Sequence, residues 1–221
     1  MVQAMVWPIS ILVIVVVFFV LFRRPVSTFI LKVQDVNIKG PGLTVQVSAQ
    51  VVGMLSAATA KPGGRDGSEA QEATSVMDQI KDIAGIANQI VTPRSIRRLS
   101  DANVLWVDDR PQNNVYERGA LEALGVGFTI SLSTDDAIAK LKSKTFDVII
   151  SDMGRPPDQK AGYTLLDQLR TSGNQTPFVI YAGSNLPEHK AMAREHGAQG
   201  STNRPQELFQ LVVGLIGGSS S

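Results

Sequence analysis

Three carboxylates stand directly after two apolar runs in the second half of the sequence. The run V-L-W-V is followed by Asp108 and Asp109, and the run V-I-I-S is followed by Asp152. If both runs are parallel strands of one sheet, these acids lie at its carboxyl edge, where ligands bind in open α/β folds. Carboxylate oxygens are ligands that suit Mg²⁺. An acidic pair alone is more often a solvated turn or a helix cap, but the three acids together predict a metal-capable pocket.

The elements that must position these acids alternate between strand and helix patterns over residues 101–217. Five short strand-like runs are each followed by a helical pattern. Because parallel strands need crossover connections, this alternation predicts an α/β fold whose parallel sheet is covered by helices on both faces. Residues 218–221, rich in serine, are predicted to be a tail.

The composition of this 221-residue chain excludes several kinds of site. With no cysteine, the chain has no disulfide, no thiolate metal ligand and no cysteine nucleophile. No P-loop and no G-x-G-x-x-G motif follows the first strand, which argues against a nucleotide site. Residues 101–221 contain 14 acidic and 11 basic residues, so we expect no binding to nucleic acid.

Residues 103–216 resemble the receiver domain of bacterial response regulators. The motifs that carry this resemblance are the acidic pair at 108–109 after the first strand, Asp152 after the third strand, G-A-x-G at 197–200, and Arg204-Pro205 where the family has Lys-Pro. The resemblance covers a little over half of the chain. It implies a flavodoxin-like fold, which is a doubly wound parallel sheet of five strands.

The resemblance also implies a role for each residue of the pocket. Asp152 corresponds to the phosphoacceptor, and the donor would be a phosphohistidine on a histidine kinase or a small phosphodonor. Asp108, Asp109 and Asp152 would hold Mg²⁺, with the main-chain carbonyl of Gly154 as a further ligand. The lysine that contacts the phosphoryl group in the family corresponds to Arg204.

Several departures from the family's pattern concern the switch that reads the phosphoryl group. Ala182 stands where the family has a serine or threonine whose hydroxyl contacts the phosphoryl group. Arg204 keeps the charge of the family's lysine but has a wider, planar fork. Tyr181 takes the strand position before Ala182, and the loop after Asp152 is longer than usual. We therefore expect an intact acidic trio and an altered switch.

The first 24 residues are predicted to form a transmembrane anchor. Residues 2–22 carry no charge and are long enough to cross a hydrocarbon core of about 30 Å. A cleaved signal peptide would show a basic start and a small-residue cleavage site, and the sequence shows neither. Arg23 and Arg24 follow the apolar segment, so the positive-inside rule places the N-terminus outside and the acidic domain in the cytoplasm.

Residues 25–100 would connect this anchor to the acidic domain. Apolar and polar residues alternate on both sides of K-G-P-G, which predicts a juxtamembrane β-hairpin over residues 25–55. A small, Gly-rich stretch predicts a flexible linker over residues 56–74. A helix and a connector are expected over residues 75–100. The apolar stripe of this helix either forms a homodimer through residues 75–91 or docks on its own domain.

These inferences together predict a signalling receiver in the bacterial inner membrane, not an enzyme. Its output would be a protein–protein contact, since no DNA-binding or catalytic motif follows the acidic domain in this sequence. The main alternative is a pseudo-receiver, an interaction or scaffold module that binds a partner without phosphotransfer. A further alternative is a different flavodoxin-like domain.

Overall fold

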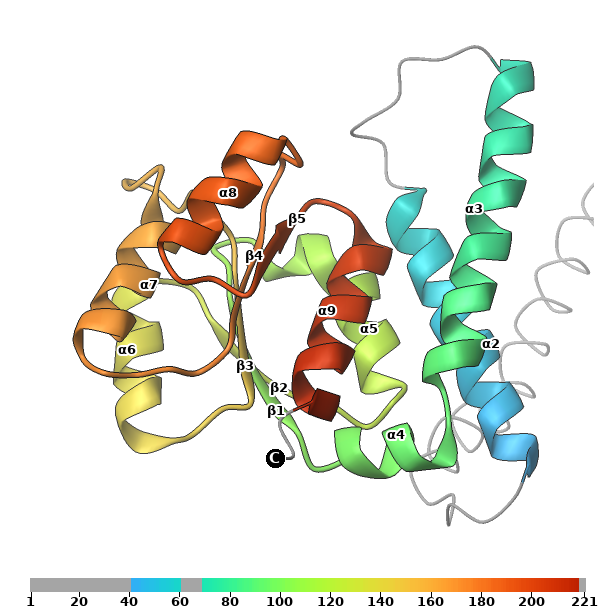
Figure 1. Cartoon of the computed structure of the whole chain (residues 1–221), viewed down its shortest axis with the longest axis horizontal. Helices are drawn as coiled ribbons and strands as arrows, with labels where there is room; N and C mark the ends of the chain where they lie inside the picture. Colours follow the sequence, from blue (N-terminus) through green and yellow to red (C-terminus); the bar gives the residue numbers. More distant parts are fainter. Residues whose placement is uncertain (1–40, 61–68, 219–221) are drawn as a thin grey trace, which may run out of the picture. The chain divides into compact units, whose positions relative to one another are not determined.

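A five-stranded parallel sheet forms the centre of residues 101–218 (Figure 1). The computed structural model describes residues 41–60 and 69–218. The strands are β1 (Asn103–Val107), β2 (Gly127–Ser131), β3 (Val148–Ser151), β4 (Phe178–Tyr181) and β5 (Gly200–Thr202). Their order is β2-β1-β3-β4-β5, and every neighbouring pair is parallel. The predicted α/β fold with five parallel strands is confirmed.

Helices follow the strands and cover both faces of the sheet (Figure 1). They are the 3-10 turn η1 (Pro111–Asn114) and the helices α5 (Val115–Glu122), α6 (Thr134–Ser143), α7 (Ala161–Thr171), α8 (Pro187–Glu195) and α9 (Pro205–Gly218). One core lies between the sheet and α5 with α9, and a second lies between the sheet and α6 to α8. Because the central strands are buried on both faces, their sequences are continuous apolar runs.

Three further helices precede the sheet and belong to the same compact unit. Helix α2 (Pro41–Thr59) lies beside α3 (Glu69–Ile90) and packs against α5 (Figure 1). The short helix α4 (Pro93–Leu99) follows and packs against α9. Side chains of α2 and α3 are buried in the same core as those of α5 and α9. The receiver-like region therefore carries two additional helices on its α5 side.

The β-hairpin predicted for residues 25–55 is wrong from Pro41 onward, because these residues form α2. Residues 25–40 lie outside the described part of the chain. The valines of α2 do alternate with polar residues, but Val47, Val51 and Leu55 also recur every four residues, and they are the buried ones. Packing against α5 and α3 outweighs the preference of β-branched residues for strands.

The linker predicted for residues 56–74 is wrong at both ends, and residues 61–68 lie outside the described part of the chain. Residues 56–59 end α2 and residues 69–74 begin α3, whose start had been predicted near residue 75. The stripe residues Ile83 and Ala87 are buried within their own chain, as the docked-helix alternative expects. A homodimer through residues 75–91 stays a prediction, and it would have to use another face of α3.

Replacing Leu55 with alanine tests whether α2 is part of the core. Leu55 is fully buried, so Leu55→Ala is expected to lower the free energy of unfolding by about 2–5 kcal/mol. The matched control is Val45→Ala, because Val45 lies on the same helix and is 69% exposed. Urea denaturation of both variants measures the difference. Equal stabilities would mean that α2 is not packed on the sheet domain in solution.

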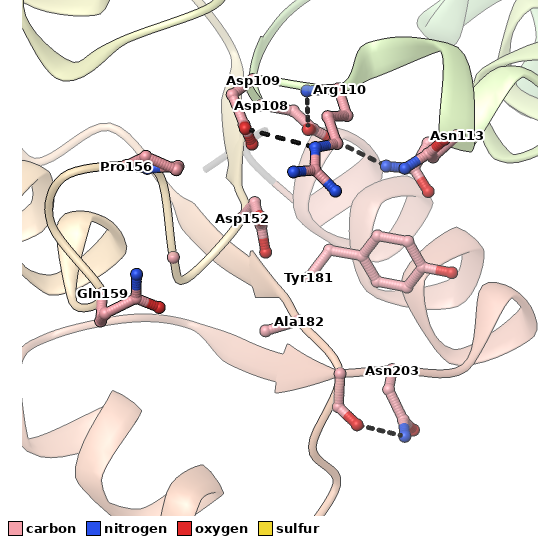
Figure 2. Close-up of a pocket in the computed structure, with 13 residues that line it drawn as sticks. Asp108, Asp109, Arg110, Asn113, Asp152, Pro156, Gln159, Tyr181, Ala182 and Asn203 are labelled. Atoms are coloured by element: carbon pink, nitrogen blue, oxygen red, sulfur yellow. Dashed lines mark hydrogen bonds and ion pairs between the residues drawn. The ribbon is translucent and has the colours of Figure 1, made fainter. Parts of the chain in front are cut away.

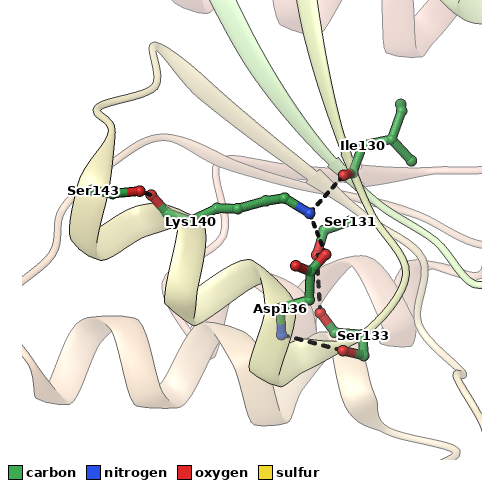
Figure 3. A network of polar contacts seen from close by, with 6 residues as sticks. All are labelled: Ile130, Ser131, Ser133, Asp136, Lys140 and Ser143. Atoms are coloured by element: carbon green, nitrogen blue, oxygen red, sulfur yellow. Dashed lines mark hydrogen bonds and ion pairs between the residues drawn. The ribbon is translucent and has the colours of Figure 1, made fainter.

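A polar network fastens the start of α6 to the end of β2 (Figure 3). Ser133 caps α6 by accepting a hydrogen bond from the Asp136 N–H. The Asp136 carboxylate accepts from the Ser131 hydroxyl and from Lys140, which also donates to the Ile130 carbonyl. These bonds hold the β2–α6 connection in place.

Asp136 gives the stability of the fold a predictable pH dependence. The Lys140 ammonium and the Ser131 hydroxyl hold the pKa of Asp136 below its usual range. A lowered folded pKa contributes stability above the unfolded pKa, and this is lost as pH falls through the folded pKa. Asp136→Asn should therefore cost up to about 1 kcal/mol near neutral pH, since the pair is partly exposed, and nothing in strong acid. Thermal melts of both proteins against pH measure this.

Within residues 41–60 and 69–218, no helix combines the length and the apolar character that crossing a bilayer requires. The transmembrane anchor predicted for residues 1–24 lies outside these ranges.

Candidate metal centre

The three predicted acids meet at one edge of the sheet (Figure 2). Val107 and Ser151, the last residues of β1 and β3, are register partners on adjacent strands, so the residues that follow them begin at the same level. Carboxylate oxygens of Asp108, Asp109 and Asp152 lie within 4.8 Å of one another. The site lies where the chain turns from β2 on one side of β1 to β3 on the other, which is the topological switch point of such sheets.

Asp108 is the most constrained of the three acids, since only 4% of the residue is exposed. Its Oδ1 accepts a hydrogen bond from the Arg110 N–H at 2.7 Å. Its Oδ2 accepts from the Asn114 side-chain amide at 2.6 Å and lies 3.4 Å from the Trp106 ring nitrogen. The 3-10 turn η1 brings Asn114 back over the strand end. These donors fix the orientation of the carboxylate.

Asp109 and Arg110 form the outer wall of the site. Asp109 Oδ2 lies 3.6 Å from Arg110 Nε, and the Arg110 side chain is 69% exposed. An exposed ion pair of this kind contributes little to stability. Asp109 can therefore exchange this partner for a bound cation at small cost.

Asp152 is half-buried at the end of β3, and its Oδ1 accepts a hydrogen bond from the Met153 N–H at 2.7 Å. Burial raises the pKa of Asp152, the Met153 N–H opposes this rise, and the carboxylates of Asp108 and Asp109 reinforce it. A cation placed among the three acids would reverse the effect of the neighbouring charges. The site thus favours binding of a positive charge.

The predicted ligand set fits a hard divalent cation such as Mg²⁺. The three carboxylates converge on one point, and Gly154 lines the same pocket. Oxygen ligands of this kind, in a solvent-open pocket that leaves room for coordinated water, match the preferences of Mg²⁺.

An open pocket of about 500 Å³ surrounds the acids (Figure 2). Ala182 and Gly183, at the end of β4, line its far side. A Cβ added at Gly183 would meet no atom within 4 Å, so the space around this residue is open. The full lining is Asp108, Asp109, Arg110, Asn113, Asn114, Asp152, Gly154, Pro156, Gln159, Tyr181, Ala182, Gly183 and Asn203.

Arg204, the predicted phosphoryl contact, lies outside this lining. Its guanidinium donates to Glu207 of α9 at 3.1 Å, and its side chain is 61% exposed. Asn203 takes the place beside the pocket and donates to the Gly183 carbonyl at 3.3 Å. A contact between Arg204 and a phosphoryl group stays a prediction, and it requires Arg204 to leave Glu207.

Tyr181 joins the pocket wall to α5. Its hydroxyl donates to the Glu117 carboxylate at 3.0 Å, and its ring lies edge-on to Trp106 with 6.0 Å between centroids. Glu117 is 3% exposed. Burial, with the neighbouring Glu117 charge, raises the pKa of Tyr181 far above its usual range, so the hydroxyl stays a donor. The sequence offered no signal that pairs these two residues.

Arg155 is the site residue that sequence reasoning missed. It follows Gly154 in the long loop after Asp152, and it is 4% exposed although it carries a charge. Its guanidinium donates to the Asp152 carbonyl and to the Ser151 hydroxyl, each at 2.7 Å. An arginine in a Gly- and Pro-rich loop would be expected on the surface, so only the structure reveals its burial.

A protein-family model described as the response regulator receiver domain matches residues 104–214, about half of the chain. The sensor histidine kinase RcsC of Salmonella typhi is 29% identical over 111 residues, which cover 50% of this chain and 12% of that protein. The gliding motility regulatory protein of Myxococcus xanthus is 26% identical over 125 residues, covering 56% of this chain and 15% of that protein. The chain thus spans only a small part of the length of these relatives.

Solved structures of similar proteins match the same region. The receiver domain of the Francisella response regulator 1452 is 22% identical and has a TM-score of 0.49, covering 55% of this chain and all of that one. The chemotaxis response regulator CheY4 of Vibrio cholerae is 26% identical and has a TM-score of 0.46, covering 52% of this chain and 98% of that one.

Proposed function

This chain belongs to the response regulator receiver domain family of two-component signalling, and we propose that Asp152 accepts a phosphoryl group in a Mg²⁺-dependent reaction. The observation that carries the proposal is the convergence of Asp108, Asp109 and Asp152 within 4.8 Å at the switch point of the sheet. The proposed donor is a histidine kinase or a small phosphodonor. The similarity to proteins named sensor histidine kinases supports that choice.

The chemistry requires a carboxylate nucleophile held in place. An Asp152 carboxylate oxygen attacks the phosphorus, the bond from phosphorus to the donor breaks, and the donor leaves with that electron pair. Asp152 then carries an acyl phosphate. Asp108, Asp109, Asp152 and the Gly154 carbonyl would hold Mg²⁺, which supplies positive charge to the phosphoryl oxygens. Asn114 and the Arg110 N–H keep Asp108 oriented throughout.

Intact-mass measurement tests this proposal. The full-length chain is incubated with acetyl phosphate, with Mg²⁺ or with a chelator in its place. The expected result is a gain of one phosphoryl group that requires Mg²⁺. If the folded protein gains nothing in Mg²⁺, Asp152 is not a phosphoacceptor for small donors, and a purified histidine kinase becomes the deciding donor.

A pseudo-receiver that binds a partner without phosphotransfer is the second candidate. Two observations favour it: Ala182 offers no hydroxyl to the pocket, and Arg204 is paired with Glu207 outside it. Such a module would bind its partner equally well as Asp152→Asn. A partner that is lost with this folded variant would count against the scaffold role.

We further propose that the protein is a receiver and not an enzyme, and that residues 1–24 anchor it in the bacterial inner membrane with the acidic domain in the cytoplasm. The uncharged residues 2–22, followed by Arg23 and Arg24, support this topology. Alkaline carbonate extraction of membranes from expressing cells tests the anchor. Release of the full-length chain into the soluble fraction would overturn it.

A further inference from the structure

Arg155 is buried behind the metal site and connects four elements of the fold. One terminal nitrogen, Nη1, donates to the Ser151 hydroxyl and the Asp152 carbonyl at 2.7 Å, and it lies 3.5 Å from the Val107 carbonyl. These acceptors belong to the ends of β3 and β1, the two strands that deliver the acids. The guanidinium therefore binds groups at the ends of both strands that deliver the acids.

The other terminal nitrogen of Arg155 reaches the helices on either side. Nη2 donates to the Thr134 hydroxyl at 3.1 Å and to the Ala161 carbonyl at 2.9 Å, at the first residues of α6 and α7. The Arg155 main chain also exchanges two hydrogen bonds with Asp158, which folds the loop back on itself. These hydrogen bonds of Arg155 therefore also restrain the position of Gly154, the residue before it and the expected carbonyl ligand.

Burying the Arg155 guanidinium here is unfavourable if it serves only the stability of the fold. Arg155 is only 4% exposed although its guanidinium carries a charge. The remaining guanidinium donor, Nε, is buried without a hydrogen-bond partner among the described residues. A buried donor left unpaired is unfavourable for stability. Arg155 lies outside the pocket lining, so it is not itself a candidate ligand for a cation bound there.

We propose that Arg155 is a positioning residue for the metal and phosphoryl site: from behind the pocket it fixes the main chain of Asp152 and the loop that presents the Gly154 carbonyl. Groups that orient metal ligands are worth about 10–100-fold in metal affinity. The inference rests on the proposed Mg²⁺ site and adds to it a residue outside the ligand set.

The test measures Mg²⁺ affinity through tryptophan fluorescence, which does not depend on phosphotransfer. Trp106 is buried, and its ring nitrogen lies 3.4 Å from Asp108 Oδ2, so it should respond to a cation bound there. The full-length chain is used in a Trp7→Phe background, which leaves Trp106 as the single tryptophan. Arg155→Met, which removes the fork, is expected to weaken Mg²⁺ binding about tenfold. Arg155→Lys should weaken it too, because one ammonium cannot reach all these acceptors.

Arg170→Met is the matched control for loss of a carbonyl-binding arginine. Arg170 is partly buried and donates to the carbonyls of Asn174 and Gly197 at 2.8 and 2.9 Å, at the opposite edge of the sheet. Its variant should keep the wild-type Mg²⁺ affinity even where its melting temperature falls. If Arg155→Met fails to fold, Thr134→Val removes a single Nη2 contact and should give a smaller loss of affinity in the same direction.

The outcomes separate this inference from the proposed function. Weaker Mg²⁺ binding in the Arg155 and Thr134 variants but not in Arg170→Met supports the positioning role. Unchanged affinity would make Arg155 a structural clamp only. Tighter binding in Arg155→Met would show that the guanidinium merely repels the cation. A wild-type protein that binds no Mg²⁺ in direct calorimetry would overturn the metal site itself and this inference with it.

Discussion

Asp152→Asn is expected to abolish phosphoryl acceptance completely while leaving the protein folded. The amide cannot act as the nucleophile, and Asp152 is the only one of the three acids that follows β3, where it lines the pocket together with Gly154 and Ala182. Intact mass after incubation with acetyl phosphate and Mg²⁺ measures this. The matched control is Asp167→Asn, which changes an exposed acid of α7 that lies outside the pocket lining and should accept one phosphoryl group as the wild type does.

The same variant is expected to be more stable than the wild type near neutral pH without Mg²⁺. Burial and the two neighbouring acids raise the folded pKa of Asp152 above its unfolded value. Stability is therefore lost as pH rises through this pKa, because the unfolded chain releases the proton more readily. Asp152→Asn removes that loss, and saturating Mg²⁺ should remove the wild type's disadvantage. A variant less stable than the wild type in a chelator would contradict this electrostatic account.

Asp108→Asn is expected to weaken Mg²⁺ binding by about 100-fold or more. Loss of a group that only orients a metal ligand costs about 10–100-fold in affinity, and loss of a ligand should cost at least as much. Asp108 is buried and preoriented by three donors, so its carboxylate reaches the cation without reorganisation. The neutral amide also presents a donor toward the Asn114 amide, which turns an attraction into a clash. Isothermal titration calorimetry with Mg²⁺ measures the loss.

Two further variants show whether the affinity lost in Asp108→Asn comes from the site itself or from the change in overall charge. Asn114→Ala removes one orienting donor and leaves all three carboxylates, so its loss should be smaller, about tenfold. Asp101→Asn changes an exposed acid just before β1, at the far end of the strand, and should leave the affinity unchanged. Equal losses in Asp108→Asn and Asp101→Asn would mean that only overall charge is measured.

The acids were predictable from sequence because their placement follows from local patterns. Short apolar runs bounded by polar residues marked β1 and β3, and the carboxyl ends of parallel strands share one edge. Helix α2 was not predictable in the same way. Its valines fit both a strand and a helix period, and only the tertiary contacts of Val51 and Leu55 decide between them.

The partners of polar side chains were also beyond the sequence. Nothing in the chain around Glu117 indicates that it meets Tyr181, 64 residues away. Likewise, Arg155 stands in a loop rich in proline and glycine, where an exposed side chain is the usual outcome, and its acceptors come from four separate elements. Contacts of this kind depend on the packing of the whole domain, so they follow from the fold and not from local composition.

The docking of α2 and α3 on the α5 side determines where a stable fragment of this chain must begin. A fragment cut at residue 101 would match the region shared with relatives, yet it would leave Leu121, Leu124 and Val212 without the helices that complete their core. Such a fragment should aggregate in solution, because these apolar residues would be exposed. A fragment intended for fusion to another protein or for crystallisation should start at Pro41, where the compact unit begins.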